Sequence, residues 1–164
     1  KDNMANSYGV DYTKRHVTTP AKLTDVSTNG GRMRVLYDTY TVVAGDIDGQ
    51  IVYFGRLPGG AKVWDASIYN SATLGSGTTI DLGWSAVDST GSTDTDGFLD
   101  GVVGTGTTTT AFMRGGADTS TGNLNTISNA PVSIANEASV VATLIGADPN
   151  AGVILQVMIT YSID

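Results

Sequence analysis

Apolar and polar side chains alternate along most of the chain after residue 31, and a period of two is typical of half-buried β-strands. The last such segment, residues 153–163, is the most regular. One of its faces carries Val153, Leu155, Val157, Ile159, Tyr161 and Ile163. The opposite face carries Ile154 and Met158 among polar residues. An exposed apolar edge strand promotes aggregation, so this strand is expected to be central in its sheet or covered by a neighbouring subunit.

Turn signals rich in Gly, Pro, Asn and Asp separate the alternating segments. Eight or nine strands are predicted, at residues 35–43, 50–57, 61–69, 78–84, 98–104, 109–113, 131–135, 138–146 and 153–163. None of these segments has a helical period. Regularly spaced strands joined by Gly/Pro turns are typical of sandwiches, jelly rolls and barrels. The predicted fold class is therefore all-β, an antiparallel β-sandwich, jelly roll or barrel.

Residues 1–31 do not show this alternation. They are rich in Asn, Thr and Ser, and they end in the turn signal N-G-G at residues 29–31. The sequence thus predicts two parts, an extended N-terminal arm (1–31) and a β-sandwich domain (32–164). Fully extended, about 31 residues reach on the order of 100 Å, which is enough to contact another molecule.

Charge distinguishes the arm from the body. The net charge is −7, yet residues 1–34 hold six basic residues against three aspartates, a net +3, and the remainder carries −10. Such an arm suits an acidic protein surface. Nucleic acid is not an expected partner, because six spread cations form no dense patch and the acidic body repels phosphate. A membrane is not expected either, since no apolar run approaches the roughly 18 residues needed to span one.

Residues 88–97, D-S-T-G-S-T-D-T-D-G, are the strongest metal candidate. An EF-hand loop needs Gly at position 6 and a bidentate Glu at position 12. With Gly97 at position 6, Asp94 and Asp96 fall at positions 3 and 5, but Val103 falls at position 12. The Asp and Gly residues are therefore interpreted as turn formers, and no metal site is predicted.

Catalytic signatures are missing from the sequence. Without cysteine there is no thiol chemistry or thiolate metal site, and the absence fits a reducing compartment. The single histidine, His16, lies in the arm beside Lys14 and Arg15. G-S-G-T-T at residues 75–79 resembles a phosphate loop but lacks its lysine. No pair of carboxylates stands out for glycoside hydrolysis. The chain is expected to have no enzymatic activity and no cofactor.

Aromatic residues leave one binding alternative open. Most lie on predicted strands, where they are expected to fill a core or a subunit interface. An exposed Trp64 or Tyr40 would instead stack on sugar rings and form a glycan-binding face.

Several stretches resemble one kind of protein. They include I-V-Y-F-G-R-L-P-G-G-A-K-V-W-D-A-S-I-Y (51–69), A-T-L-G-S-G-T-T-I-D-L-G-W (72–84) and the A-D-P-N-A-G turn (147–152) with its flanking strands. Together they make residues 32–164 similar to small structural proteins of tailed bacteriophages, of the head-decoration, cement and head-fibre type. The resemblance implies a jelly-roll-like subunit, usually trimeric, on the outside of an icosahedral head.

The expected function is that of a non-enzymatic virion protein that decorates and stabilises a phage capsid. Its expected location is the outer surface of the head, assembled in the host cytoplasm, with the major capsid protein and two further copies of itself as partners. The alternative is a glycan- or receptor-binding module of a phage tail or fibre. The residues expected to contact the capsid or a second subunit are Tyr8, Tyr12, Lys14, Arg15, His16, Lys22, Ile154 and Met158.

Overall fold

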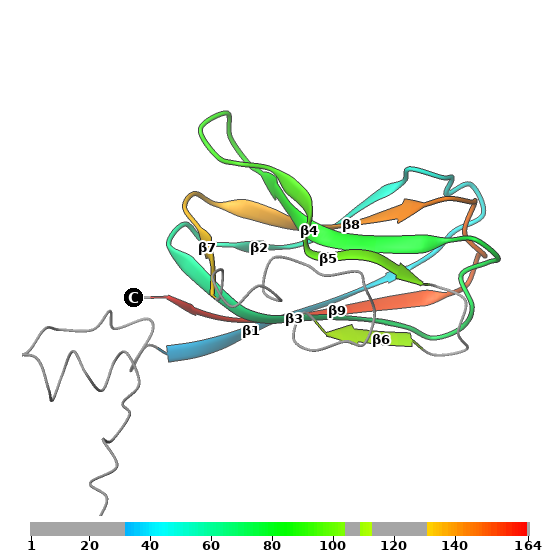
Figure 1. Ribbon diagram of the computed structural model, residues 1–164, viewed down its shortest axis with the longest axis horizontal. Coiled ribbons are helices and arrows are strands. Elements are labelled where there is room, and N and C mark those ends of the chain that lie inside the picture. Colours follow the sequence, from blue (N-terminus) through cyan, green and yellow to red (C-terminus); the bar gives the residue numbers. More distant parts are fainter. Residues whose placement is uncertain (1–31, 104–108, 113–130, 164) are drawn as a thin grey trace, which may run out of the picture.

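The computed structural model describes residues 32–103, 109–112 and 131–163, which form nine strands in two facing sheets (Figure 1). The strands are β1 (Arg32–Thr41), β2 (Ile51–Leu57), β3 (Ala61–Asn70), β4 (Thr79–Ala86), β5 (Asp94–Val103), β6 (Thr109–Phe112), β7 (Val132–Ile134), β8 (Ala138–Ile145) and β9 (Ile154–Ile163). No helix occurs in these ranges, so the predicted all-β sandwich is confirmed. No helix long and apolar enough to cross a membrane is present among the described residues.

Consecutive strands alternate between the two sheets, except that β4 and β5 share one sheet and β6 and β7 share the other. One sheet has the order β1-β9-β3-β6, with β7 also paired to β3, and the other has the order β2-β8-β4-β5. All the pairings between named strands are antiparallel. With β7 set aside, four strands face four strands, an arrangement that is jelly-roll-like. The last strand, β9, lies between β1 and β3, which agrees with the central position expected from its apolar character.

The core fills the space between the sheets. Leu155, Val157 and Ile159 of β9 point inward and are fully buried, as the alternation of residues 153–163 predicts. From the facing sheet, Ile80 and Leu82 of β4 meet them, also with no exposed surface.

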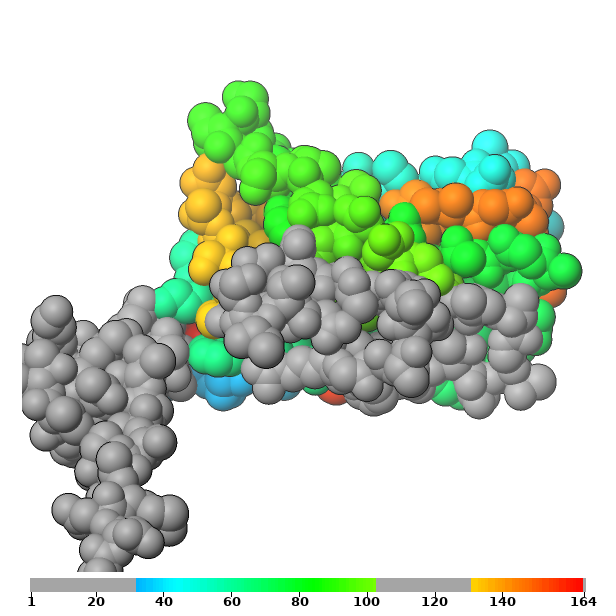
Figure 2. All heavy atoms as spheres, viewed as in Figure 1, coloured from blue at the N-terminus to red at the C-terminus, as the bar shows by residue number. Residues whose placement is uncertain are grey.

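β5 begins earlier than the sequence predicts. The loop 88–97 was expected to lead into a strand at residue 98, but the structure places Asp94 and Asp96 inside β5. Two register shifts let β5 carry extra residues against β4. One of them brings the β5 backbone across Gly83, where an added Cβ would overlap the carbonyl oxygen of Asp94. The hairpin between β4 and β5 then projects from the body of the molecule (Figure 2).

Candidate functional site

The residues of β1 and β9 that point into the core identify which residues lie on the outer side of this strand pair. Val42, Leu155 and Val157 are buried, and Leu36 and Tyr40 pack against the core. Side chains alternate along a strand, so the odd-numbered residues of β1 and the even-numbered residues of β9 point outward. The alternation also places these outward side chains next to one another across the two strands, with Tyr37 opposite Met158 and Thr41 opposite Ile154.

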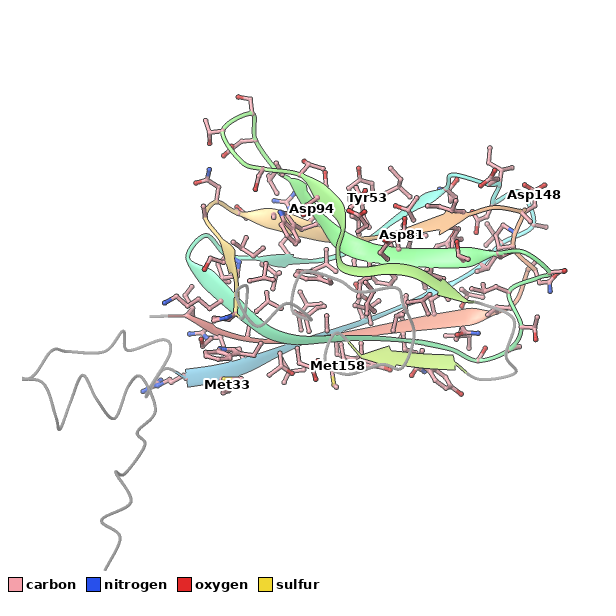
Figure 3. All side chains as sticks on the ribbon, in the orientation of Figure 1. Met33, Tyr53, Asp81, Asp94, Asp148 and Met158 are labelled. Atoms are coloured by element: carbon pink, nitrogen blue, oxygen red, sulfur yellow. The ribbon has the colours of Figure 1, made fainter. Side chains whose placement is uncertain are left out.

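Five large apolar side chains gather on this outer side, and we call them the β1–β9 face. They are Met33, Val35, Tyr37, Ile154 and Met158, exposed by 56%, 61%, 61%, 38% and 41%. The remaining outward positions of the two strands are Thr or Gln, apart from the fully buried Ser162, so none of these positions carries a charge. Interface centres are depleted of charge and enriched in Met and Tyr. The composition of the β1–β9 face is therefore typical of an interface centre. Figure 3 shows Met33 and Met158 on this side, with Tyr53 on the opposite side.

The predicted contact residues divide into two groups. Ile154 and Met158 lie on the β1–β9 face, as expected from their place opposite the apolar side of the last strand. The others, Tyr8, Tyr12, Lys14, Arg15, His16 and Lys22, lie outside the described residues. Sequence reasoning missed Val35 and Tyr37, because residues 35–43 are apolar on both faces and the pattern does not say which face is buried. It missed Met33 because the predicted strand begins at residue 35, whereas β1 begins at Arg32.

The two aromatic residues named for the glycan alternative are already engaged within the fold. The Trp64 indole N–H donates a hydrogen bond of 2.8 Å to the hydroxyl of Ser162, and the ring is only partly exposed. The Tyr40 ring packs against the core, and its hydroxyl donates to Asp46 at 2.8 Å. This hydrogen bond raises the pKa of Tyr40. Among the strand side chains whose exposure is described, the exposed aromatic ones are instead Tyr37 and Tyr53, on opposite faces of the sandwich.

Asp88 organises the tip of the β4–β5 hairpin. Its Oδ1 accepts hydrogen bonds from the backbone N–H and hydroxyl of Thr90, at 2.8 and 2.6 Å, and from the N–H of Gly91 at 3.2 Å. The Thr90 bonds, with that of Gly91, lower the pKa of Asp88. Asn136 ties the tip down through its amide, which donates to the Thr90 carbonyl at 2.9 Å. The structure thus confirms that Asp88 shapes a turn, and two of the three loop carboxylates belong to β5.

Within the described residues, no group of three or more His, Cys, Asp or Glu side chains could hold a metal ion. Acidic side chains nevertheless interact on the outer side of β4 and β5, where the charges of Asp96 and Asp100 act on Asp81. Its carboxylate accepts a hydrogen bond of 2.7 Å from the N–H of Gly101, where β5 bulges with a φ of 65°. Burial raises the pKa of Asp81, and the negative charges of Asp100 and Asp96 raise it further, against the lowering effect of the Gly101 bond.

We expect Asp81→Asn to stabilise the protein at neutral pH by less than about 1 kcal/mol, because Asp81 is partly exposed and screened. The folded state binds the Asp81 proton more tightly than the unfolded state does. The contribution of Asp81 is therefore fully present at acidic pH and is lost as the pH rises through the raised pKa. Asparagine keeps an oxygen that accepts the Gly101 bond but carries no charge. Urea unfolding of both proteins at pH 3 and pH 7 measures the effect. The prediction is wrong if the stability of the variant, relative to that of the unsubstituted protein, is no higher at pH 7 than at pH 3.

No protein-family model matches the chain, and no curated protein matches it. Solved structures do match. A chain in the capsid of Ralstonia phage GP4 has a TM-score of 0.57 and 20% identity, over 87% of this chain and 92% of that chain. A chain in the capsid asymmetric unit of cyanophage Pam1 has a TM-score of 0.50 and 18% identity, over 90% and 96%. At these identities the likeness shows a shared fold, and both neighbours come from phage capsids.

Proposed function

We propose that this protein is a non-enzymatic virion structural protein that binds the outer surface of a bacteriophage head and stabilises it. The observation that carries the proposal is the β1–β9 face, on which five large apolar side chains are exposed and none is charged, in a sandwich whose fold neighbours are chains of phage capsids. A monomeric protein rarely leaves such a surface uncovered. Assembly into a virion provides partners that cover it.

The proposed assembly is a homotrimer that contacts the major capsid protein. The β1–β9 face joins the subunits, since Met and Tyr are enriched at interface centres and Tyr is among the residues that contribute most of the binding energy. The N-terminal residues Tyr8, Tyr12, Lys14, Arg15 and His16 then reach the capsid. Two tyrosines supply anchors, and the basic residues suit an acidic protein surface. Assembly takes place in the host cytoplasm, where the lack of cysteine is no disadvantage.

Binding to capsids that lack this protein tests the function directly. The purified full chain is expected to co-sediment with such capsids and to raise the temperature at which they release DNA. Deletion of residues 1–19 is expected to weaken binding and to make the residual binding less sensitive to salt, because exposed Lys and Arg contacts are screened over about 8 Å at physiological ionic strength.

Two results would overturn the proposal. One is that the full chain neither co-sediments with the capsids nor changes their stability. The other is binding to a glycan array that is lost in Tyr37→Ala or Tyr53→Ala, which would favour a receptor-binding module. If the deletion variant binds capsids with unchanged affinity, the decorating function remains supported, but the N-terminal residues do not contribute to binding.

A further inference from the structure

The free edge of β1 is the longest uninterrupted sheet edge in the part of the chain that the structure describes. β1 ends its sheet, and it pairs with β9 from Arg32 to Thr41 without a register shift. The other edges are interrupted or short, since β2 has one register shift, β5 has two and β6 spans only Thr109–Phe112. Natural proteins protect long regular edges, because unpaired backbone groups invite another strand. Among the described residues, no strand pairs with this edge of β1.

The hydrogen bonds just beyond β1 show which of its backbone groups face the free edge. The N–H of Val42 donates to the carbonyl of Val153 at 2.8 Å, and the carbonyl of Val42 accepts from the N–H of Gly152 at 2.8 Å. Both groups of Val42 therefore point toward the segment that leads into β9. Because an antiparallel ladder alternates, the even-numbered residues of β1 face β9 and the odd-numbered residues face the free edge. Val35 and Tyr37 thus direct their N–H and C=O groups outward along this edge.

One end of the edge is closed by a side chain of β1 itself. The N–H of Thr39 donates to the Asp38 carboxylate at 2.8 Å, so this N–H needs no strand partner. An inward-pointing charged residue is one of the ways in which natural proteins end a sheet edge. The open stretch therefore runs from Met33, next to the first residue of β1, to the carbonyl of Thr39. Leu36 lies at the midpoint of this stretch.

The charges along β1 are arranged symmetrically about Leu36. Arg34 lies two residues before it and Asp38 two residues after it, so the three side chains lie on the same side of the strand. Arg34 makes no ion pair with any other described residue. A two-fold contact needs a surface that is complementary to itself, because the same patch is used by both copies. A basic and an acidic residue at equal distances from a central apolar residue form such a surface.

We propose that the free edge of β1 pairs antiparallel with the same edge of a second copy of this chain, about a two-fold axis at Leu36. In this register Arg34 of each copy lies opposite Asp38 of the other, and opposite charges at such positions are favourable. Leu36, which is half-buried, lies opposite its own counterpart. On the outer side Val35 lies opposite Tyr37 of the second copy, an aromatic and β-branched pair that also stabilises a sheet. The outward backbone groups of Val35 and Tyr37 then bond to one another.

Other positions of the axis fit the side chains less well. An axis at Arg34 places two arginines opposite each other and an axis at Asp38 places two aspartates together, and like charges directly opposite are destabilising. An axis at Val35 places Arg34 opposite Leu36. An axis at Tyr37 places Asp38 opposite Leu36. Of these five axes, only the one at Leu36 pairs Arg34 with Asp38 and leaves the leucine against another leucine.

The proposed contact is small, because one pair of strands buries less surface than a standard protein interface. It therefore does not change the mass of the trimer in dilute solution, and it forms where copies of the chain are crowded. The place where this happens rests on the proposed function. Trimers bound side by side on a phage head would be linked through their β1 edges, and many weak links between bound trimers would together strengthen the decorated head.

Engineered disulfides test the contact in the purified full chain alone, which has no cysteine of its own. Met33→Cys with Thr39→Cys leaves Arg34 and Asp38 in place and occupies a hydrogen-bonded pair across the axis, with Cα atoms about 5.5 Å apart and within reach of a disulfide. Within one chain the two positions are about 20 Å apart along the strand and cannot bond. Mild oxidation at high protein concentration is expected to give a covalent dimer whose peptide map shows bonds between positions 33 and 39.

The single substitutions Met33→Cys and Thr39→Cys are the matched controls, because the two-fold register holds equivalent positions of the two copies about 20 Å apart. The double variant should give at least ~10-fold more covalent dimer than either single variant. Adding Arg34→Asp to the double variant should lower the yield at least ~5-fold, because it places two carboxylates opposite each other. Adding Asp38→Arg as well should restore the yield, which separates the charge pair from a folding defect.

Each other outcome contradicts the proposal. Equal yields in the single and double variants mean random collision or parallel pairing, and no dimer from the double variant means that the edge does not pair with itself. Covalent trimers mean that the cysteines meet in a three-fold contact, since a two-fold contact closes as a dimer. A yield that Arg34→Asp leaves unchanged, or that Asp38→Arg does not restore, means that the register is wrong. No capsid is present in this experiment, so its failure leaves the co-sedimentation test of the proposed function unaffected.

Discussion

Replacing Phe98 with alanine should lower the free energy of unfolding by about 3–5 kcal/mol, the range for large aromatic residues removed from a core. Phe98 has no exposed surface, and its ring lies 5.0 Å from that of Trp84, measured between centroids. The neighbouring β5 backbone is held close to β4 at Gly83 and Gly97, so the surroundings cannot collapse easily into the cavity. Urea or guanidinium unfolding of the two proteins measures the loss.

The matched control for this experiment is Tyr53→Ala. Tyr53 is also an aromatic residue on a strand, but 62% of its surface is exposed. Its removal should cost less than about 1 kcal/mol, as most surface substitutions do. Similar losses in the two variants would mean that Phe98 is not a central core residue, and the packing of β5 over β4 would then need revision.

The same region shows where sequence reasoning reaches its limit. The stretch 88–97 is rich in Asp, Ser, Thr and Gly, a composition that favours a loop, and half of that interpretation is right: Asp88 and Thr90 do form a turn. β5 nevertheless begins at Asp94, because Gly83 on another strand lets its backbone approach closely. Gly97 likewise makes room for the Trp84 ring. These approaches depend on residues distant in sequence, so no local pattern reveals them.

The positions of the strands along the chain were more accessible to prediction than the site. Period-two alternation and Gly/Pro turns are local, and they located the strands to within a few residues. For the site, Ile154 and Met158 stood out because the other side of their strand is wholly apolar, which fixes the buried face. Residues 35–43 lack that asymmetry. Only the packing of Leu36 and Tyr40 against the core shows that Val35 and Tyr37 point outward.

Trp64 illustrates the same difficulty on β3. Alternation alone predicts either a core position or an open stacking surface for it. The structure has a register shift between Val63 and Asp65, so Trp64 is an extra residue on its strand. The shift places its indole N–H next to Ser162, which is fully buried. A bulge changes which face a side chain occupies, and its position depends on the neighbouring strand.

The last prediction concerns the proposed contact between subunits. The full chain is expected to have a mass three times its 16.9 kDa in solution, and Tyr37→Asp combined with Met158→Asp is expected to reduce it to a monomer. Tyr37 and Met158 lie directly opposite each other at the centre of the β1–β9 face. Association of the subunits would bury two new carboxylates in an apolar surface. The free energy of association should therefore weaken by at least about 2 kcal/mol, which is ~30-fold in Kd.

Tyr53→Asp provides a closely matched control, because Tyr53 is 62% exposed and Tyr37 is 61% exposed, on opposite faces of the sandwich. Both changes replace an exposed strand tyrosine with a carboxylate, so they should affect solubility and folding alike. Only the change at Tyr37 should lower the mass measured by light scattering. A trimer that survives the double substitution, or one that is lost equally in Tyr53→Asp, would show that the β1–β9 face is not the contact between subunits. If the unsubstituted chain is monomeric at high concentration, the proposed trimer is wrong. The β1–β9 face would then be proposed to contact the capsid only.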